Sequence, residues 1–296
     1  MKRIITVTLL LFCFQISTSQ TLNQSLKDAK GKDKLLGQIN KEGLTQAPFN
    51  DWFTKNHKTY IVNKPLAKSF KKQLNDYSVK VFLGTWCGDS KREVPRFYKV
   101  LEAVNFPEAQ LEVYALDKTK EAYKQGPNGE EKDLNIHRVP TFIFYKDGKE
   151  VNRIVEHPKA TFENDISAIL KGKYTPNYRI ANYVHALLKD SEISKLKDME
   201  PYLVSQLSEY VKGSRELNTL GYVNLRAGKI DEAIYIFDLN AKMFPYKSRV
   251  YDSLAEAYYE AKNYHEALKN YYKVLSIEPT DENAIEMIDT IKKTTK

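Results

Sequence analysis

The chain has 296 residues, of which 42% are hydrophobic and 28% are charged. This is the composition of an ordinary globular protein, and the length allows two or three domains with cores of their own. The formal net charge is +8, but the lysines are interleaved with acidic residues along the whole chain. Such a pattern is typical of a solvated surface, so it argues against a nucleic-acid partner.

Residues 1–19 have the pattern of a secretory signal peptide. Lys2 and Arg3 precede an apolar run over residues 4–14, and small residues suited to cleavage follow up to Ser19. The run is too short to span a bilayer as a helix. We therefore expect an exported protein, periplasmic or secreted, that has no stable membrane span after signal removal. A retained membrane anchor is the alternative interpretation.

The cysteine count limits the chemistry that the mature protein can perform. The two cysteines are Cys13, within the expected signal peptide, and Cys87. The mature protein would keep Cys87 alone, so it could form no internal disulfide. An unpaired cysteine in an exported protein indicates a reactive thiol or an intermolecular bridge, such as a disulfide-linked dimer. The alternative is a buried cysteine that behaves as a small hydrophobic residue.

The first part of the mature chain changes character near residue 46. Residues 20–45 are polar and are interpreted as a tether or a short amphipathic helix. A folded domain is expected over residues 46–172. Within it, apolar positions at helical spacing predict a helix over residues 66–74, and an apolar run predicts a buried strand over residues 79–83.

Cys87 follows this strand directly. The apolar run stops at Gly84, and a helical pattern begins at Ser90 and Lys91 and continues to Asn105. Cys87 is therefore expected at or just before a helix N-terminus. The unpaired N–H groups and the helix dipole at such a position stabilise a thiolate.

Two motifs in this region resemble those of the thioredoxin family. The run from Trp86 to Lys91 is similar to the family's Trp-Cys-Gly-Pro-Cys-Lys motif, and Pro95 matches the proline that kinks the helix after it. Residues 139–148 resemble the family strand that begins at a cis-proline facing the active-site cysteine, here Pro140. The resemblance covers residues 75–172. It implies an α/β thioredoxin-like domain, with a central mixed sheet flanked by helices.

Four departures from the family pattern concern the chemistry directly. Ser90 replaces the second, resolving cysteine, and Asp89 replaces the proline between the two cysteines. Val81 stands where the family holds a buried aspartate thought to accept a proton, and Arg138 stands where a glycine often lies. These departures argue against ordinary dithiol oxidoreduction.

The remaining predicted elements fit the thioredoxin order. A short strand is expected over residues 111–116 and a long polar segment over residues 118–137. A hairpin turns at Asp147 and Gly148, and a helix follows from about Thr161 to Leu170. The Lys-Gly-Lys-Tyr-Thr-Pro stretch over residues 171–176 is the expected domain boundary.

The C-terminal part is expected to be all-α. Residues 173–213 are interpreted as a helical connector or cap, and residues 214–296 as two repeats with a C-terminal helix. A period of 34 residues aligns Gly221 with Ala255 and Phe237 with Tyr271. This pattern resembles the tetratricopeptide repeat, which implies a docking arm for partner peptides.

The candidate site residues all lie in the thioredoxin-like domain. The proposed catalytic pair is Cys87 and Ser90. The residues expected to shape the thiolate environment and the substrate groove are Trp86, Gly88, Asp89, Lys91, Val139, Pro140 and Glu156. The Ser90 hydroxyl and Lys91 would stabilise a Cys87 thiolate, whereas Asp89 would oppose it.

Three residues near the expected groove have roles that the sequence leaves open. Glu156 or His157 could accept a proton in place of the missing aspartate, or the two could form an exposed loop pair. His137, beside the motif proline, presents the same choice. No cofactor or metal is expected, because we see no tight His/Asp/Glu cluster and no phosphate-binding glycine loop.

Monothiol exchange or client-thiol capture at Cys87 is the predicted function. Its partners would be protein clients that carry thiols or disulfides, and the groove could bind extended peptide beside Pro140 by strand addition. The alternative is a redox-silent scaffold in which both domains bind peptides or proteins without catalysis.

Overall fold

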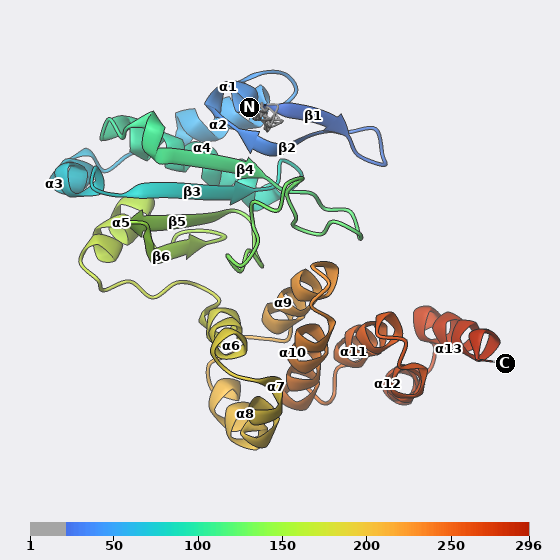
Figure 1. Ribbon diagram of the computed structural model, residues 1–296. Helices are drawn as coiled ribbons and strands as arrows, with labels where there is room; N and C mark the ends of the chain where they lie inside the picture. Colours follow the sequence, from blue (N-terminus) through green and yellow to red (C-terminus); the bar gives the residue numbers. More distant parts are fainter. Residues whose placement is uncertain (1–21, 296) are drawn as a thin grey trace, which may run out of the picture.

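The computed structural model describes residues 22–295, so the predicted signal peptide lies outside the described part. An α/β domain comes first and a helical arm follows it, as predicted (Figure 1). Within residues 22–295, no helix is both long enough and apolar enough to cross a bilayer.

A six-stranded mixed sheet forms the centre of the α/β domain. Its strands are β1 (Gln24–Lys27), β2 (Asp33–Ile39), β3 (Ser78–Leu83), β4 (Leu111–Ala115), β5 (Thr141–Lys146) and β6 (Lys149–Val155). Their spatial order is β1-β2-β4-β3-β5-β6, in which β3 and β4 are parallel and the other pairs are antiparallel. The predicted apolar strand is thus β3, and both of its sheet neighbours are present.

Helices pack on both faces of this sheet (Figure 1). They are α1 (Lys41–Thr45), α2 (Asn50–Thr59), α3 (Lys64–Leu74), α4 (Gly88–Ala103) and α5 (Phe162–Leu170), with a 3-10 turn at Glu108–Gln110. An aromatic cluster joins α4, β5 and α5: the Phe97 ring centroid lies 4.6 Å from that of Phe142 and 5.3 Å from that of Phe162. Burial of each ring contributes about 2–3 kcal/mol. This cluster fixes α4 against β5, and so fixes Cys87 relative to Pro140.

The interpretation of residues 20–45 as a tether or short helix is wrong for residues 24–39, which form two strands. β2 pairs with β4, with Ile39 opposite Val113, and its Leu35 and Ile39 side chains are each only 2% exposed. Lys34 is also buried, in an ion pair with Asp117 at 2.6 Å. Lys34 interrupts the apolar alternation of β2, so the segment looked polar. Its partner Asp117 lies far along the chain, so the local sequence does not show that Lys34 is buried.

Eight helices of the described chain form the arm. They are α6 (Arg179–Asp190), α7 (Ile193–Asp198), α8 (Glu200–Ser208), α9 (Arg215–Arg226), α10 (Ile230–Met243), α11 (Ser248–Glu260), α12 (Tyr264–Ile277) and α13 (Glu282–Thr294). Successive helices from α9 to α13 pack against one another. Gly221 allows the close contact of α9 with α10, since a Cβ there would lie 2.4 Å from the Phe237 ring. The helical character of residues 173–295 is as predicted.

The arm contacts the α/β domain through the long segment between β4 and β5. Gln125 Nε2 donates to the Arg226 carbonyl at 2.6 Å, and Lys229 forms an ion pair with Asp133 at 2.8 Å. Figure 1 shows the arm beneath the loops at this end of the sheet. The segment thus lies between the arm and the end of β3, where Cys87 is located.

Candidate functional site

Cys87 lies at the N-terminus of a long helix. It is the N-cap residue of the 16-residue helix α4, with extended backbone angles, and its side chain makes no capping hydrogen bond. The Lys91 N–H donates to the Cys87 carbonyl at 3.0 Å, which is the first hydrogen bond of the helix. The half-buried thiol therefore faces the unpaired N–H groups and the positive end of the helix dipole, as predicted.

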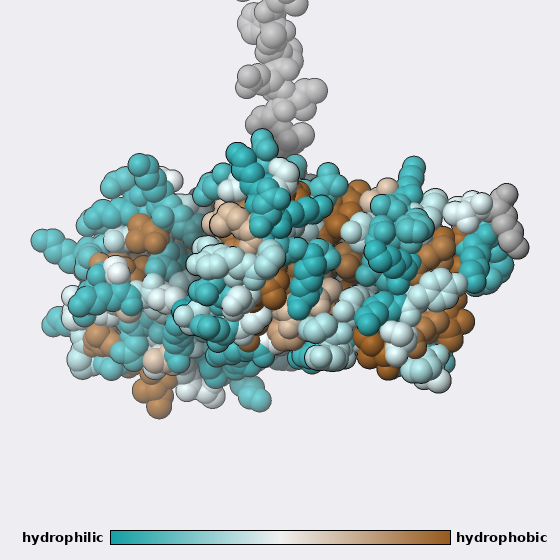
Figure 2. Space-filling model, turned by 90° about the horizontal axis from the view of Figure 1, so that it is seen from below, coloured by the Kyte–Doolittle hydropathy of each residue, from teal (hydrophilic) through white to brown (hydrophobic). Residues whose placement is uncertain are grey.

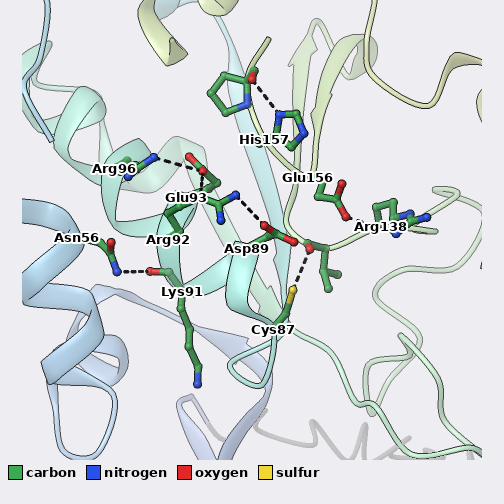
Figure 3. Close-up of polar contacts among 12 residues, drawn as sticks. Asn56, Cys87, Asp89, Lys91, Arg92, Glu93, Arg96, Arg138, Glu156 and His157 are labelled. Atoms are coloured by element: carbon green, nitrogen blue, oxygen red, sulfur yellow. Dashed lines mark hydrogen bonds and ion pairs between the residues drawn. The ribbon is translucent and has the colours of Figure 1, made fainter. Parts of the chain in front are cut away.

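The thiol also contacts the loop that holds Pro140. The Val139–Pro140 peptide bond is cis, and Cys87 Sγ lies 3.3 Å from the Val139 carbonyl oxygen (Figure 3). In this geometry the protonated thiol donates to the carbonyl. The structure thus brings together Cys87, Val139 and Pro140, which the sequence analysis had assigned to one groove.

Ser90 lies in the first turn of α4, as expected, and its oxygen contacts the backbone before the cysteine. Its side chain is fully buried, and its hydroxyl oxygen accepts a hydrogen bond from the Gly84 N–H at 3.1 Å. Gly84 also leaves room for the Trp86 indole, since a Cβ there would lie 2.5 Å from the ring. The hydroxyl hydrogen of Ser90 remains available, but the contact that holds its oxygen is with the backbone before the cysteine rather than with the thiol.

The charged side chains of Asp89 and Lys91 both have positions that limit their effect on the thiol. The Asp89 carboxylate accepts from Arg92 Nη2 at 2.7 Å, so a guanidinium offsets its charge. The Lys91 side chain extends away from Cys87 in Figure 3. Lys91 is therefore not placed to stabilise the thiolate, whereas the neutralised Asp89 opposes the thiolate less than a free carboxylate would.

Trp86 and Gly88 shape the surface on either side of Cys87. The Trp86 indole N–H donates to the Leu116 carbonyl at 2.8 Å, and the half-buried ring packs on the apolar cluster that contains Phe82 and Val139. Gly88 is exposed, and a Cβ built there would meet nothing within 4 Å. One side of the thiol is therefore walled by the indole, and the other is open.

Glu156 borders the Pro140 loop, as expected, but it is not part of an exposed pair with His157. Its N–H donates to the Pro140 carbonyl at 2.7 Å. Its carboxylate lies 3.4 Å from Arg138 Nη1 and accepts a hydrogen bond from the Tyr178 hydroxyl. The Arg138 guanidinium also stacks on the Tyr178 ring, 4.7 Å from its centroid. The start of the arm thus holds the residues that flank the cis-proline.

A lysine near Cys87 was missed in the sequence analysis. Lys124 is only 4% exposed, and its ammonium group lies 2.5 Å from the Tyr123 hydroxyl. Burial lowers the pKa of Lys124 to about 7, and Arg138 acts in the same direction, while Cys87 and Glu156 oppose the shift. The lysine belongs to an irregular segment of the chain, so no periodic pattern in the sequence marks it.

His137 is buried rather than exposed to the groove. Its Nδ1 atom lies 3.3 Å from the Asn135 carbonyl oxygen, and its Nε2 atom is buried without a hydrogen-bond partner. Burial lowers the pKa of His137 well below its usual value, and the positive charge of Lys124 adds to this effect. The ring is therefore neutral near pH 7, and Nε2 is an unpaired hydrogen-bond acceptor when Nδ1 carries the hydrogen.

The described residues place no carboxylate at the position of the family's buried aspartate. Val81 on β3 is buried and apolar. Groups of three or more His, Cys, Asp or Glu that could hold a metal ion do not occur within residues 22–295. Lys124 instead interacts electrostatically with Cys87, and the Arg138–Glu156 pair flanks the cis-proline loop that the thiol contacts.

Comparisons with known proteins agree with the fold of the α/β domain. A family model described as Thioredoxin matches residues 60–168. Thioredoxin Asp f 29 of Aspergillus fumigatus is 30% identical over 105 residues, which cover 34% of this chain and 88% of that protein. H-type thioredoxins of Picea mariana and Oryza sativa subsp. indica are 28% and 31% identical over 88 and 85 residues, and the matches cover 62% of each. The chain belongs to the thioredoxin family, and the arm lies outside the matched residues.

Proposed function

We propose that this protein performs thiol–disulfide exchange of the monothiol type through Cys87. The observation that carries the proposal is the position of this cysteine at the N-terminus of α4, against the cis-Pro140 loop, with a buried serine in place of a resolving cysteine. Thioredoxin-family membership supports thiol–disulfide redox chemistry in general. Ser90 restricts it to reactions in which the second thiol comes from elsewhere.

The reaction proceeds in two balanced steps. The Cys87 thiolate attacks one sulfur of a client disulfide, a new S–S bond to Cys87 forms, and the other client sulfur leaves as a thiolate with the electron pair. A second thiolate then attacks the mixed disulfide and releases Cys87. When this thiolate belongs to the client, the net result is isomerisation without net oxidation. When it belongs to a small-molecule thiol, the client cysteine leaves as a mixed disulfide with that thiol, and a second molecule of the thiol is needed to reduce it.

The residues around Cys87 support this role in different ways. The helix N-terminus and the Lys124 ammonium both favour the thiolate, while the Val139 carbonyl is the hydrogen-bond acceptor of the protonated thiol. The backbone at Val139 offers an edge to which an extended client segment can add as a strand.

The proposal extends to location and partners. The sequence pattern of residues 1–19 supports export to a periplasmic or extracellular compartment, where disulfide-bearing clients are abundant. The 34-residue repeat pattern and the stacked helix pairs α9–α13 support a tetratricopeptide-like arm that docks partner peptides. Cell fractionation with an antibody to the chain tests the location.

A redox-silent scaffold is the second candidate function. It is favoured by the hydrogen bonds that tie both the Cys87 thiol and the Ser90 hydroxyl to the backbone of the fold. In that case the Pro140 groove and the arm would bind peptides, and Cys87 would not react faster than a free cysteine.

A disulfide isomerisation assay separates the two candidates. The protein without residues 1–19 is incubated with a small client whose disulfides are scrambled, in a weakly reducing thiol buffer. Monothiol exchange predicts recovery of native client with the wild type and with Ser90→Ala, and loss of this activity in Cys87→Ser. Equal recovery with wild type and Cys87→Ser would favour the scaffold.

A further inference from the structure

A large cleft separates the α/β domain from the arm, close to the proposed site. Its volume is about 1310 Å³, and its lining comes from the β6–α5 loop, the linker before α6, the loop before α9 and the loop between α10 and α11. This cleft is distinct from the backbone edge at Val139, because its walls come mainly from residues after 155. The arm therefore contributes a surface of its own beside the α/β domain.

The charge of this cleft is strongly unbalanced. Seven lysines or arginines line it, against three glutamates. Six of the basic side chains are exposed and form no ion pair with a carboxylate among the described residues: Lys159, Arg179, Lys212, Arg215, Lys247 and Arg249. Figure 2 shows that the face of the molecule seen from below is mostly hydrophilic.

The three glutamates of the lining offset only part of this positive charge. Glu156 is held by Arg138 and Tyr178, and Glu216 is buried, with one oxygen accepting from the Ala181 N–H at 2.9 Å. Burial raises the pKa of Glu216. Glu278 accepts from the Ser248 hydroxyl at 2.9 Å. Seven bases against three glutamates therefore leave the lining with a net positive charge, although Glu216 interacts electrostatically with Arg138 and Arg179. This net charge favours an anionic ligand.

The cleft borders the cis-proline loop that contacts Cys87. Arg138 and Glu156 line it, and Arg138 precedes Val139, whose carbonyl oxygen lies 3.3 Å from Cys87 Sγ. The Glu156 N–H donates to the Pro140 carbonyl at 2.7 Å. A polypeptide whose cysteine reaches Cys87 can therefore extend past the cis-proline into the cleft.

Exposed tyrosines lie among the basic groups. Tyr210 is 53% exposed and stacks with the Arg179 guanidinium at 4.1 Å, and Tyr246 is 90% exposed beside Lys247. Tyrosine and arginine side chains are the groups most enriched at the energetic centres of protein interfaces. The cleft thus combines charge with apolar contact area of the kind that suits a peptide.

We propose that this cleft binds an acidic segment of the client polypeptide, adjacent in sequence to the cysteine that reacts with Cys87. The inference rests on the proposed exchange function, and it names the clients as proteins with an acidic stretch beside a cysteine. The basic side chains attract the segment by long-range charge, so selectivity for such clients falls as salt is added.

Matched peptides test the inference on the protein without residues 1–19. Each peptide carries one cysteine as a mixed disulfide with thionitrobenzoate, flanked by either a run of acidic residues or a neutral run of the same length. The Cys87 thiolate attacks the peptide sulfur, the existing S–S bond breaks, and the thionitrobenzoate anion that leaves with the electron pair is followed by its absorbance. The acidic peptide should react about tenfold faster at low salt and lose most of this advantage at about 0.5 M salt.

Charge-neutral variants locate the effect. The triple variant Lys212→Gln/Arg215→Gln/Arg249→Gln should remove most of the acidic peptide's advantage and leave the neutral peptide's rate unchanged. The control Lys64→Gln/Lys68→Gln/Lys72→Gln makes the same charge change on α3, at the opposite end of β3 from Cys87, and should retain the advantage. Equal rates for the two peptides with the wild type, or an advantage that survives the cleft variant, would overturn the inference.

A binding measurement separates this inference from the exchange function. Fluorescence anisotropy of a labelled acidic peptide without cysteine reports cleft binding even where no exchange occurs. If the neutral peptide fails to react, the exchange function fails, and salt-sensitive binding lost in the cleft variant still supports the cleft. Tighter binding of a single-stranded oligonucleotide of equal charge would overturn an acidic polypeptide as the occupant.

Discussion

The Cys87 Sγ atom lies 3.3 Å from the carbonyl oxygen of Val139, the residue before the cis-proline. A protonated thiol is stabilised by this acceptor, whereas a thiolate would be repelled by it. The charge that favours the thiolate must therefore come from elsewhere. The N-terminus of α4 begins at Cys87, and the buried Lys124 ammonium interacts electrostatically with it.

Ser90→Cys should restore dithiol chemistry. Cysteines at the N-cap and the third position of a helix are close enough to form a disulfide, as in the family motif. The variant should lose both titratable thiols on mild oxidation without dimerising, and it should gain disulfide reduction that the wild type lacks. The cost in stability should be about 1 kcal/mol, because the hydroxyl acceptor of the Gly84 N–H is lost.

Ser90→Ala is the matched control, since it removes the same acceptor without adding a thiol. It should show the stability loss alone in urea unfolding. Two thiols that stay titratable after oxidation of Ser90→Cys, or a disulfide-linked dimer in place of the internal bond, would contradict the geometry described for this turn.

Lys124→Met should stabilise the protein near neutral pH and slow its exchange reaction. The folded-state pKa of Lys124 is about 7, against 10.5 for the unperturbed group. Between these values the unfolded chain binds more protons, so stability rises with pH and the cost of burying the ammonium is largest below about pH 7. The gain in the variant should be about 2 kcal/mol at pH 6.5 and should shrink towards pH 10.

The same variant tests the role of the ammonium beside Cys87. Loss of its charge should lower the rate of exchange with a neutral peptide disulfide most clearly below pH 7. Lys132→Met is the control, because it changes an exposed lysine of the same segment. A stability gain that is independent of pH would contradict the lowered pKa of Lys124. An unchanged exchange rate at pH 6.5 would show that its charge does not assist Cys87.

Lys34→Met should destabilise the α/β domain by about 3 kcal/mol at pH 7, because it leaves the buried Asp117 carboxylate without its cation. Burial raises the pKa of Asp117, but hydrogen bonds from Lys34 and from the N–H groups of Lys118 and Thr119 outweigh it and lower the pKa. The stabilisation is present above about pH 4 and is lost as pH falls through the lowered value.

Urea unfolding at pH 7 and near pH 3 checks this dependence on pH. The difference between wild type and Lys34→Met should narrow at the lower pH, and Lys34→Met/Asp117→Leu should recover part of the loss at pH 7. Lys27→Met breaks only an exposed pair with Asp33 and should change little. A neutral result for Lys34→Met would mean that β2 does not belong to the cooperative sheet.

Gly221→Val should destabilise the arm, since the added side chain would overlap the Phe237 ring between α9 and α10. Overpacking of this kind costs about 1–3 kcal/mol. Gly213→Ala is the control, because nothing lies within 4 Å of a Cβ at that position. Thermal unfolding followed by circular dichroism should separate the two, and equal stability of both variants would contradict the tight helix contact.

The sequence predicted the elements that carry their own local signals. The apolar run of β3, the amphipathic α4 and the helix start after Cys87 follow from residue patterns, and the family motifs placed Pro140 opposite the thiol. The strands β1 and β2 were missed because β2 gains its stability from β4, far along the chain, and because Lys34 interrupts its apolar alternation.

The rest of the site depends on tertiary contacts that cannot be predicted from a local sequence pattern. Lys124 belongs to an irregular segment, and only the fold brings it beside Cys87. The interaction of Arg138 with Glu156 and Tyr178 joins three parts of the chain, the last of which begins the arm. Ser90 was assigned to the thiol because of its spacing in the motif, but its buried oxygen is held by Gly84.

The most direct test of the account is the capture of the mixed disulfide. The protein without residues 1–19 is mixed with a client that holds a single disulfide, quenched with acid, and analysed by intact-mass and peptide mass spectrometry. Monothiol exchange predicts one covalent adduct at Cys87 that accumulates in the wild type, is short-lived in Ser90→Cys and is absent from Cys87→Ser. Failure of the wild type to form the adduct, where a free cysteine peptide forms it readily, would contradict monothiol exchange.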